Sequence, residues 1–361
     1  MKNEQAAENL YWNERVKKLS PYVPGEQPKD RQFIKLNTNE NPYPPSPKVI
    51  EAIQKSVNER LRLYPDPECV EFREAVAKRY NVKIEQIFAG NGSDEILAFA
   101  FGAFFESGTP ILFPDVTYSF YPVYANLWNI PCRAIPLCED FTVNINDYKI
   151  PSGGVVLPNP NAPTGIALEL DGVLSLAEYL EKQGKVFILD EAYAAFGAKS
   201  AVPFIDKHPN LLTVHTLSKS ASLAGLRAGY AIGSEELIKG LCRIRDSFNS
   251  YTLDRLALAG ASAAVSDAEY YEKANNRVIT TRERVSNSLR SMGFNVLLSS
   301  ANFLFIKPPG INGADFFTML RENGILVRHF NKERIKDFLR VTVGTDEEMD
   351  KFIKVCKEII K

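Results

Sequence analysis

Five segments carry side chains that could do chemistry, and each comes directly after an apolar run. They are residues 90–95 (GNGSDE), 115–121 (DVTYSFY), 158–165 (PNPNAPTG), 190–193 (DEAY) and 218–227 (SKSASLAGLR). In open parallel sheets, ligands lie beyond the carboxyl ends of the strands. If the apolar runs are strands of one such sheet, these segments meet at one edge and form a single site.

Lys219 is the nucleophile candidate in the last of these segments. Most lysines are solvated surface charges, but Lys219 has small and apolar neighbours. Burial there would lower the pKa of the amine and make it a nucleophile. Such lysines form Schiff bases with carbonyl substrates and with pyridoxal phosphate. The hydroxyls of Ser218 and Ser220 and the guanidinium of Arg227 would suit the phosphate of that cofactor.

The glycine turn at 90–95 follows a predicted strand and opens a predicted helix. Its backbone N–H groups and the helix dipole favour an anion. A plain turn, with Ser93 or Asp94 as the N-cap of the helix, explains the segment equally well. A dinucleotide-binding loop is disfavoured, because Glu95 stands where GxGxxG has its third glycine.

Asp190 and Glu191 end another apolar run and resemble the magnesium-binding strand of nucleotide hydrolases. That function needs a GxxxxGK[ST] loop, and the chain has none. An acid that forms an ion pair at a strand end is the simpler alternative. Asp190 therefore needs a partner other than a nucleotide-bound metal.

Other catalytic sets find little support in the sequence. The three histidines, His208, His215 and His329, show no HExxH or other zinc spacing, so no metal site is predicted. There is no GxSxG motif of a serine hydrolase. A carboxylate pair for glycoside hydrolysis stays possible, but nothing selects one.

The composition is typical of a globular protein of one or two domains. The 361 residues are 45% hydrophobic and 24% charged, with a formal net charge of −1, which argues against a nucleic-acid binder. The longest apolar run, 96–105, is too short to cross a membrane, and the N-terminus lacks the apolar core of a signal peptide. Five cysteines without CxxC spacing indicate a reducing compartment, so we expect a soluble cytoplasmic enzyme.

The elements that must position the candidate residues alternate along the middle of the chain. Helical periodicity is found over 48–60, 69–80, 96–105 and 170–183. Apolar runs predict buried strands at 86–89, 110–113, 155–157, 186–189, 211–216 and 229–232. Strands alternating with helices indicate parallel connections and a sheet covered on both faces.

The pattern changes after about residue 250. A long charged helix is predicted over 269–292, followed by a strand at 302–306, a helix from 314 and strands at 325–328 and 338–343. We expect an α/β fold with a doubly wound, mostly parallel sheet in a large domain over 45–250. A smaller α+β domain is expected over 251–361, with an N-terminal arm over 1–44 that contributes to it.

Taken in this order, the segments resemble the class I/II pyridoxal-phosphate-dependent aminotransferases of fold type I. The specific pattern is DEAY at 190–193 followed by SKSASLAGLRAGY at 218–230. The resemblance extends from about residue 21 to 345 and is closest to the histidinol-phosphate aminotransferases. It implies pyridoxal 5′-phosphate as the cofactor.

The resemblance also implies roles around the cofactor ring and phosphate. Lys219 would bind the cofactor covalently, Asp190 would pair with the protonated pyridine nitrogen, and Tyr193 would donate to the ring's phenolic oxygen. Tyr118 resembles the aromatic residue that stacks on the ring. The cofactor's phosphate would be bound by four further residues, Ser93, Asp94, Ser218 and Arg227.

Further positions resemble residues that bind the substrate or reach another subunit. Arg340 matches the arginine that binds the amino acid's carboxylate, and Arg328 and Tyr22 match positions assigned to the substrate phosphate. Asn39 belongs to a signature near the substrate. Tyr64 is similar to a tyrosine that reaches the cofactor of the partner subunit, which implies a homodimer.

One departure from the family pattern affects the cofactor site. The family usually has asparagine directly before the proline of PTG, where it contacts the ring oxygen, but this chain has Ala162. Either the preceding Asn161 takes over that contact, or the ring oxygen depends more on Tyr193. The proline usual before the TY pair is Val116 here, which should change only the stiffness of the loop.

The expected reaction is ping-pong transfer of an amino group. The specific expectation is L-histidinol phosphate plus 2-oxoglutarate giving imidazole acetol phosphate plus glutamate, in histidine biosynthesis. Alternatives are an aromatic amino-acid aminotransferase or a phospho-amino-acid decarboxylase of the same fold. A non-catalytic regulator is disfavoured by the intact set around Lys219, and a nucleotide-dependent enzyme by the missing phosphate loop.

Overall fold

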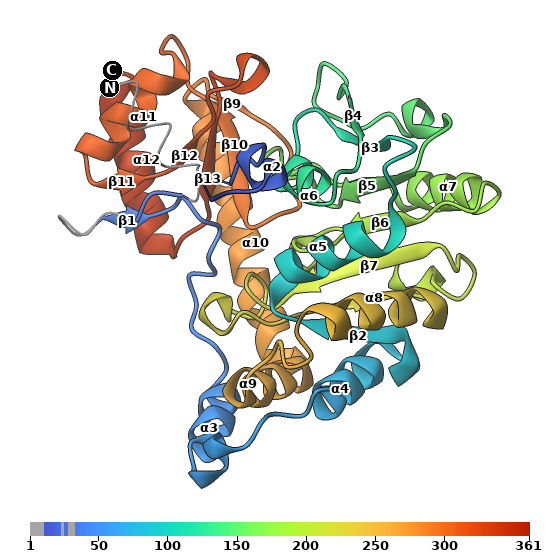
Figure 1. The fold of residues 1–361 in the computed structure, drawn as a ribbon. Coiled ribbons are helices and arrows are strands. Elements are labelled where there is room, and N and C mark those ends of the chain that lie inside the picture. Colours follow the sequence, from blue (N-terminus) through green and yellow to red (C-terminus); the bar gives the residue numbers. More distant parts are fainter. Residues whose placement is uncertain (1–10, 23–24, 28–32) are drawn as a thin grey trace.

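The structure, a computed structural model, describes residues 11–22, 25–27 and 33–361 (Figure 1). A seven-stranded sheet forms the centre of one part of the molecule, and the C-terminal elements build a smaller part beside it. The N-terminal arm expected over 1–44 lies partly outside the described residues. Within the described ranges, every helix is too short or too polar to span a lipid bilayer.

The strands of the large sheet follow the order β2-β8-β7-β6-β5-β3-β4. Their bounds are β2 Ile87–Gly90, β3 Ile111–Pro114, β4 Cys132–Ile135, β5 Gly154–Pro158, β6 Phe187–Asp190, β7 Leu211–Thr216 and β8 Gly229–Ile232. All neighbours pair in parallel except β8, which is antiparallel to β2 and β7. β8 follows β7 without the crossover helix that a parallel connection needs. The predicted α/β fold with a mostly parallel sheet is confirmed.

Strand β4 and the helix before it, α6 (Tyr121–Leu127), were not predicted from the sequence. β4 lies at the edge of the sheet and its first three residues are exposed, so it has no apolar run. α6 has only seven residues, too few to show helical periodicity. The six predicted strands of this sheet lie within one residue of their expected bounds.

Helices cover both faces of the large sheet. α5 and α8 pack on one face and α7 on the other, with bounds of Gly92–Phe104 for α5, Leu170–Glu181 for α7 and Glu235–Phe248 for α8. Alternate residues of β5 point to the two sides, since Val156 packs with α5 while Val155 and Leu157 pack with α7. The strands are therefore apolar on both faces, which drives their burial in a parallel sheet.

The C-terminal elements surround a four-stranded antiparallel sheet in the order β12-β13-β10-β9. Their bounds are α10 Ala268–Ser291, β9 Asn295–Val296, β10 Phe303–Lys307, α11 Gly313–Glu322, β12 Arg328–His329, β13 Leu339–Thr342 and α12 Asp346–Ile359. The N-terminal arm joins them, because β1 (Ile34–Lys35) pairs in parallel with β11 (Ile325–Leu326). Leu36 then lies in their apolar core.

Helix α9 (Arg255–Ser266) follows the expected domain boundary near residue 250 but packs on the large sheet's side. Its partners there are α3 (Pro47–Ser56) and α4 (Val70–Tyr80). Helix α10 extends across both parts, since Tyr271 packs in the core beside α9 and Val285 in the C-terminal core (Figure 1). The division into domains stays a prediction, and these contacts favour a boundary within α10.

Gly229 lies where β8 passes the N-terminus of α5. A Cβ at Gly229 would lie 2.8 Å from the His215 carbonyl oxygen and 2.9 Å from the Ser93 nitrogen. We expect Gly229→Ala to lower the free energy of unfolding by about 1–3 kcal/mol in urea titrations, as overpacking does. Gly225→Ala is the matched control, because nothing lies within 4 Å of its Cβ position. Equal stabilities of the two variants would contradict this close packing.

Candidate active site

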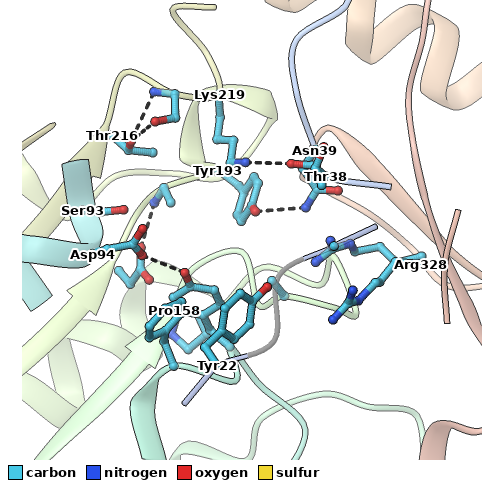
Figure 2. Close-up of a pocket in the computed structure, with 18 of the residues that line it drawn as sticks. Tyr22, Thr38, Asn39, Ser93, Asp94, Pro158, Tyr193, Thr216, Lys219 and Arg328 are labelled. Atoms are coloured by element: carbon cyan, nitrogen blue, oxygen red, sulfur yellow. Dashed lines mark hydrogen bonds between the residues drawn. The ribbon is translucent and has the colours of Figure 1, made fainter. Parts of the chain in front are cut away.

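The carboxyl ends of the central strands open onto a cavity of about 530 Å³. β5, β6 and β7 end at Pro158, Asp190 and Thr216, and all three residues line it. The N-terminal arm and the C-terminal strands line the other side (Figure 2). All the predicted site residues except Asn161 and Tyr64 line this cavity.

Lys219 follows β7 and projects its amine into the cavity. Its Nζ donates a 3.0 Å hydrogen bond to the backbone carbonyl of Thr38, in the N-terminal arm (Figure 2). Burial, with a smaller contribution from the positive charge of Arg340, lowers the pKa of the amine to about 8. At pH 7 about a tenth of the amine is then neutral, against less than a thousandth for an ordinary lysine, so Lys219 can act as a nucleophile.

Asp190 ends β6 and is almost fully buried. Its carboxylate accepts hydrogen bonds from the Tyr121 hydroxyl at 2.9 Å and from the Ala192 backbone N–H at 3.1 Å. Burial raises the pKa of this carboxyl to about 6, although these two hydrogen bonds oppose the shift. No salt bridge to Asp190 is formed within the described ranges. A cation bound in the cavity would supply the missing counter-charge and favour the ionised form.

An anion-binding cradle lies at the N-terminus of α5. Arg227 donates from Nη1 to Ser218 Oγ at 3.2 Å and from Nη2 to Asp94 Oδ2 at 3.2 Å. A Cβ at Gly92, whose φ is +78°, would lie 2.7 Å from Arg227 Nη2, so only glycine lets the guanidinium approach the helix. The first N–H groups of a helix and an arginine together suit a phosphate, as expected for Ser93, Asp94, Ser218 and Arg227.

Two tyrosines line the cavity between the cradle and the N-terminal arm. The Tyr118 hydroxyl donates to Asp94 Oδ1 at 2.7 Å. The Tyr193 hydroxyl accepts a hydrogen bond from Asn39 Nδ2 at 2.9 Å (Figure 2). Burial raises the pKa of both phenols, so both hydroxyls are protonated at neutral pH.

Two arginines lie at the other end of the cavity. The guanidinium carbons of Arg328 and Arg340 lie 5.9 and 5.6 Å from the centroid of the Phe330 ring. Arg340 Nη2 donates to the backbone carbonyl of Asn37 at 3.1 Å, while its buried Nε has no hydrogen-bond partner among the described residues. Two guanidinium ions at the same cavity can bind a carboxylate or a phosphate.

Tyr22 brings an aromatic surface from the N-terminal arm to the same end of the cavity. Its ring stacks on Phe120, with 4.3 Å between centroids and 26° between planes. Figure 2 shows Tyr22 and Arg328 on one side of the cavity and Ser93 and Asp94 on another. A ligand with two anionic groups would therefore find a basic site at each end.

The structure does not bring Asn161 to the cavity. Its Oδ1 accepts from the Thr117 hydroxyl at 3.1 Å, and its Nδ2 donates to the Val116 carbonyl at 2.9 Å and to Thr164 Oγ1 at 3.2 Å. The neighbouring Ala162 lines the cavity instead. Because both ends of the Asn161 amide are occupied, these contacts favour the alternative in which the ring oxygen depends more on Tyr193.

Tyr64 also lies outside the cavity of its own chain. Its side chain is 78% exposed, and its ring stacks on Tyr251 with 4.6 Å between centroids. A role for Tyr64 at a cofactor would thus require a second subunit.

The sequence analysis missed two residues that contact the candidate catalytic groups directly. Tyr121 binds Asp190, and the carbonyl of Thr38 accepts from Lys219. Tyr121 belongs to the DVTYSFY segment and Thr38 directly precedes Asn39, but their contacts join segments more than 60 residues apart. Sequence position alone could not indicate these contacts.

The lowered pKa of Lys219 has a direct test. Only the neutral amine attacks an aldehyde, so the rate at which pyridoxal 5′-phosphate attaches should rise with pH around a midpoint near 8. An ordinary lysine would titrate near pH 10.4 instead. The attached cofactor can be trapped with borohydride and located by peptide mass spectrometry. Lys219→Arg is the control, and a midpoint near that of an ordinary lysine would show that burial does not activate this amine.

Comparison with known proteins identifies related sequences over nearly the whole chain. Residues 31–355 match the family model described as aminotransferase class I and II. Histidinol-phosphate aminotransferase of Clostridium acetobutylicum is 54% identical over 350 residues, which cover 97% of this chain and 99% of that protein. The enzyme of the same name from Acetobacter pasteurianus is 52% identical, covering 97% and 98%.

Solved structures agree with the fold. The crystal structure of histidinol-phosphate aminotransferase from Sinorhizobium meliloti in complex with pyridoxal-5′-phosphate superposes with a TM-score of 0.87 at 23% identity. It covers 97% of this chain and 98% of that one. The family match and the identity to these relatives show that this chain belongs to the class I and II aminotransferases.

Proposed function

We propose that this protein transfers the amino group of L-histidinol phosphate to 2-oxoglutarate with pyridoxal 5′-phosphate as cofactor, giving imidazole acetol phosphate and glutamate in histidine biosynthesis. One observation carries the proposal: a single cavity combines an activated lysine, a buried carboxylate, an anion cradle and two further arginines. Relatives above 50% identity that cover nearly the whole chain are named for this reaction.

The donor set of the cavity fits pyridoxal phosphate. Arg227, Ser218 and the N-terminus of α5 would bind the phosphate. Among the described residues Asp190 has no cationic partner, and a protonated pyridine nitrogen would supply one. Lys219 is the amine within reach of an aldehyde in that space. When bound, the cofactor withdraws electrons from the substrate's Cα, which makes the Cα proton acidic.

The protein's own residues would position groups and move the proton. Lys219 Nζ, with its pKa near neutrality, can accept and return a proton within the cavity. The hydrogen bonds from Tyr121 and Ala192 fix the Asp190 carboxylate, which is mostly ionised at pH 7. Removal of that charge would raise the barrier, because a buried carboxylate stabilises a nearby cation more strongly than water does.

Substrate selection would depend on the basic end of the cavity. Arg340 offers a buried Nε–H that has no partner in the part of the chain that the structure describes, and Arg328 lies on the same side as Tyr22. The planar guanidinium of arginine can donate two parallel hydrogen bonds either to a phosphate monoester or to an amino-acid carboxylate. The ring of Tyr22 and that of Phe120 provide an aromatic wall for an imidazole.

The proposal is tested by the absorbance spectrum of the purified protein with pyridoxal 5′-phosphate. We expect a visible band that L-histidinol phosphate bleaches, and borohydride reduction should abolish the band and leave the cofactor attached to Lys219 through a stable C–N single bond. Phenylalanine, which has no phosphate for Arg328, should bleach the band at least about tenfold more slowly. Equal rates would indicate an aromatic amino-acid aminotransferase, release of carbon dioxide would indicate a decarboxylase, and no band would exclude the cofactor.

Arg328→Gln completes this test. The variant should raise KM for histidinol phosphate by about 10- to 100-fold, and the preference over phenylalanine should fall by the same factor. Arg133→Gln, on the exposed edge strand β4, is the control and should change neither value. An unchanged preference in Arg328→Gln would assign the phosphate to other residues.

We also propose a homodimer in which Tyr64 reaches the partner's cofactor. Tyr64 is exposed and does not line the cavity of its own chain, which supports this assignment. Tyr251, which stacks on Tyr64, and Phe248, three residues before Tyr251, are exposed as well. Sedimentation equilibrium should give twice the chain mass of 40.4 kDa. A monomer that binds pyridoxal phosphate with unchanged affinity after Tyr64→Ala would contradict it.

A cytoplasmic location is proposed as well. All five cysteines lie in the described residues and are free thiols, which supports a reducing compartment.

A further inference from the structure

Asn39, which lines the cavity, is held by hydrogen bonds of both its backbone and its side chain. Its backbone N–H donates to Thr342 Oγ1 at 2.9 Å, and its Oδ1 accepts from the same hydroxyl at 3.1 Å. Its backbone carbonyl accepts from Asn302 Nδ2 at 3.0 Å. In this arrangement the Thr342 hydroxyl gives its hydrogen to Oδ1, and Nδ2 faces Tyr193.

This orientation decides what the Tyr193 hydroxyl can do. The oxygen accepts the Asn39 N–H at 2.9 Å, and its own proton has no acceptor among the residues that the structure describes. A phenol carries one proton, so Tyr193 is left as a donor toward the cavity (Figure 2). The backbone hydrogen bonds of Asn39 thus determine the direction of a hydrogen bond to a ligand.

The backbone of Asn39 is also suited to this task. Its φ is +55°, in the left-handed region that asparagine tolerates better than most residues. The side chain is 1% exposed, so water does not compete for the amide. At the position of the family asparagine, Ala162 presents a methyl group, and the amide of Asn161 is engaged with Val116, Thr117 and Thr164.

We infer that Asn39 is a positioning residue that acts through Tyr193, holding the phenol as the hydrogen-bond donor to the cofactor's phenolic oxygen in a site where Ala162 supplies none. This inference rests on the proposed cofactor but not on the proposed substrate. It changes the role of Asn39 from a substrate contact to control of the cofactor's protonation.

Several charged groups near Tyr193 also influence any titration measured at this site. Arg340, Asp190 and Asp94 act on Tyr193 electrostatically, and Lys219 Nζ lies 6.0 Å from the centroid of its ring. None of these groups forms a hydrogen bond to the Asn39 side chain. A substitution at Asn39 therefore alters the direction of the Tyr193 hydroxyl while leaving these charges in place.

The test is the pH titration of the cofactor's visible absorbance in the holoenzyme without substrate. Asn39→Gly removes the amide and keeps a residue that adopts positive φ freely. A donor at the phenolic oxygen stabilises the deprotonated form, so weakening it should raise the titration midpoint by about half to one pH unit. Tyr193→Phe should raise it too, and the double variant should match Tyr193→Phe alone.

Two further variants keep the test decisive. Asn39→Asp is nearly isosteric and also tolerates positive φ. Its carboxylate can only accept hydrogen bonds, so the Tyr193 hydroxyl would donate to it and not to the cofactor, and the titration midpoint of this variant should rise as well. Asn81→Gly makes the same chemical change at another left-handed position, the exposed C-cap of α4, and should leave the midpoint unchanged.

An unchanged midpoint in Asn39→Gly, or additive shifts in the double variant, would overturn the inference. If Asn39→Gly raised only KM, the residue would be a substrate contact. Failure of histidinol phosphate as a substrate would leave this titration intact, whereas the absence of any band in the wild-type protein would refute the proposed cofactor itself.

Discussion

Removal from water is the physical constraint on which this site depends. A charged amine and a charged carboxylate both lose hydration in an apolar interior, so each shifts toward its neutral form. The pKa of Lys219 falls to about 8 and that of Asp190 rises to about 6, for the same first cause. The carboxyl edge of a sheet that is apolar on both faces provides such an interior next to an open cavity. The chemistry therefore follows from where the strands end.

The N-terminal arm has a larger part in the site than its polar composition indicates. Three residues within four positions of the arm each form a hydrogen bond to a residue that follows a strand of the large sheet. Thr38 accepts from the Lys219 amine, Asn39 donates to Tyr193, and Asn41 donates from its amide to the Lys219 carbonyl at 3.1 Å. Segments of this kind cannot pack a core alone, but they satisfy polar groups that strands and helices leave at the cavity.

The sequence was sufficient to predict the mostly parallel sheet and the segments that meet at its edge. That succeeded because buried strands are apolar runs, and a parallel sheet places the residues after each run together. The orientation of individual side chains could not be predicted from the sequence. Asn161 lies in a recognised motif, yet Val116, Thr117 and Thr164 turn its amide away from the cavity. Such choices depend on tertiary contacts that no local pattern records.

The parallel pairing of β1 with β11 has a consequence for synthesis of the chain. Residues 34–39 leave the ribosome early, but their partners come near the end: Leu36 accepts from Thr342, and Asn39 from Asn302. The cofactor side of the cavity can be translated in full while its opposite wall is still being made. An incomplete nascent chain thus carries the reactive lysine and the arm, but it lacks the C-terminal residues that hold the arm in place. The cavity is completed only when the last strand, β13, has been synthesised.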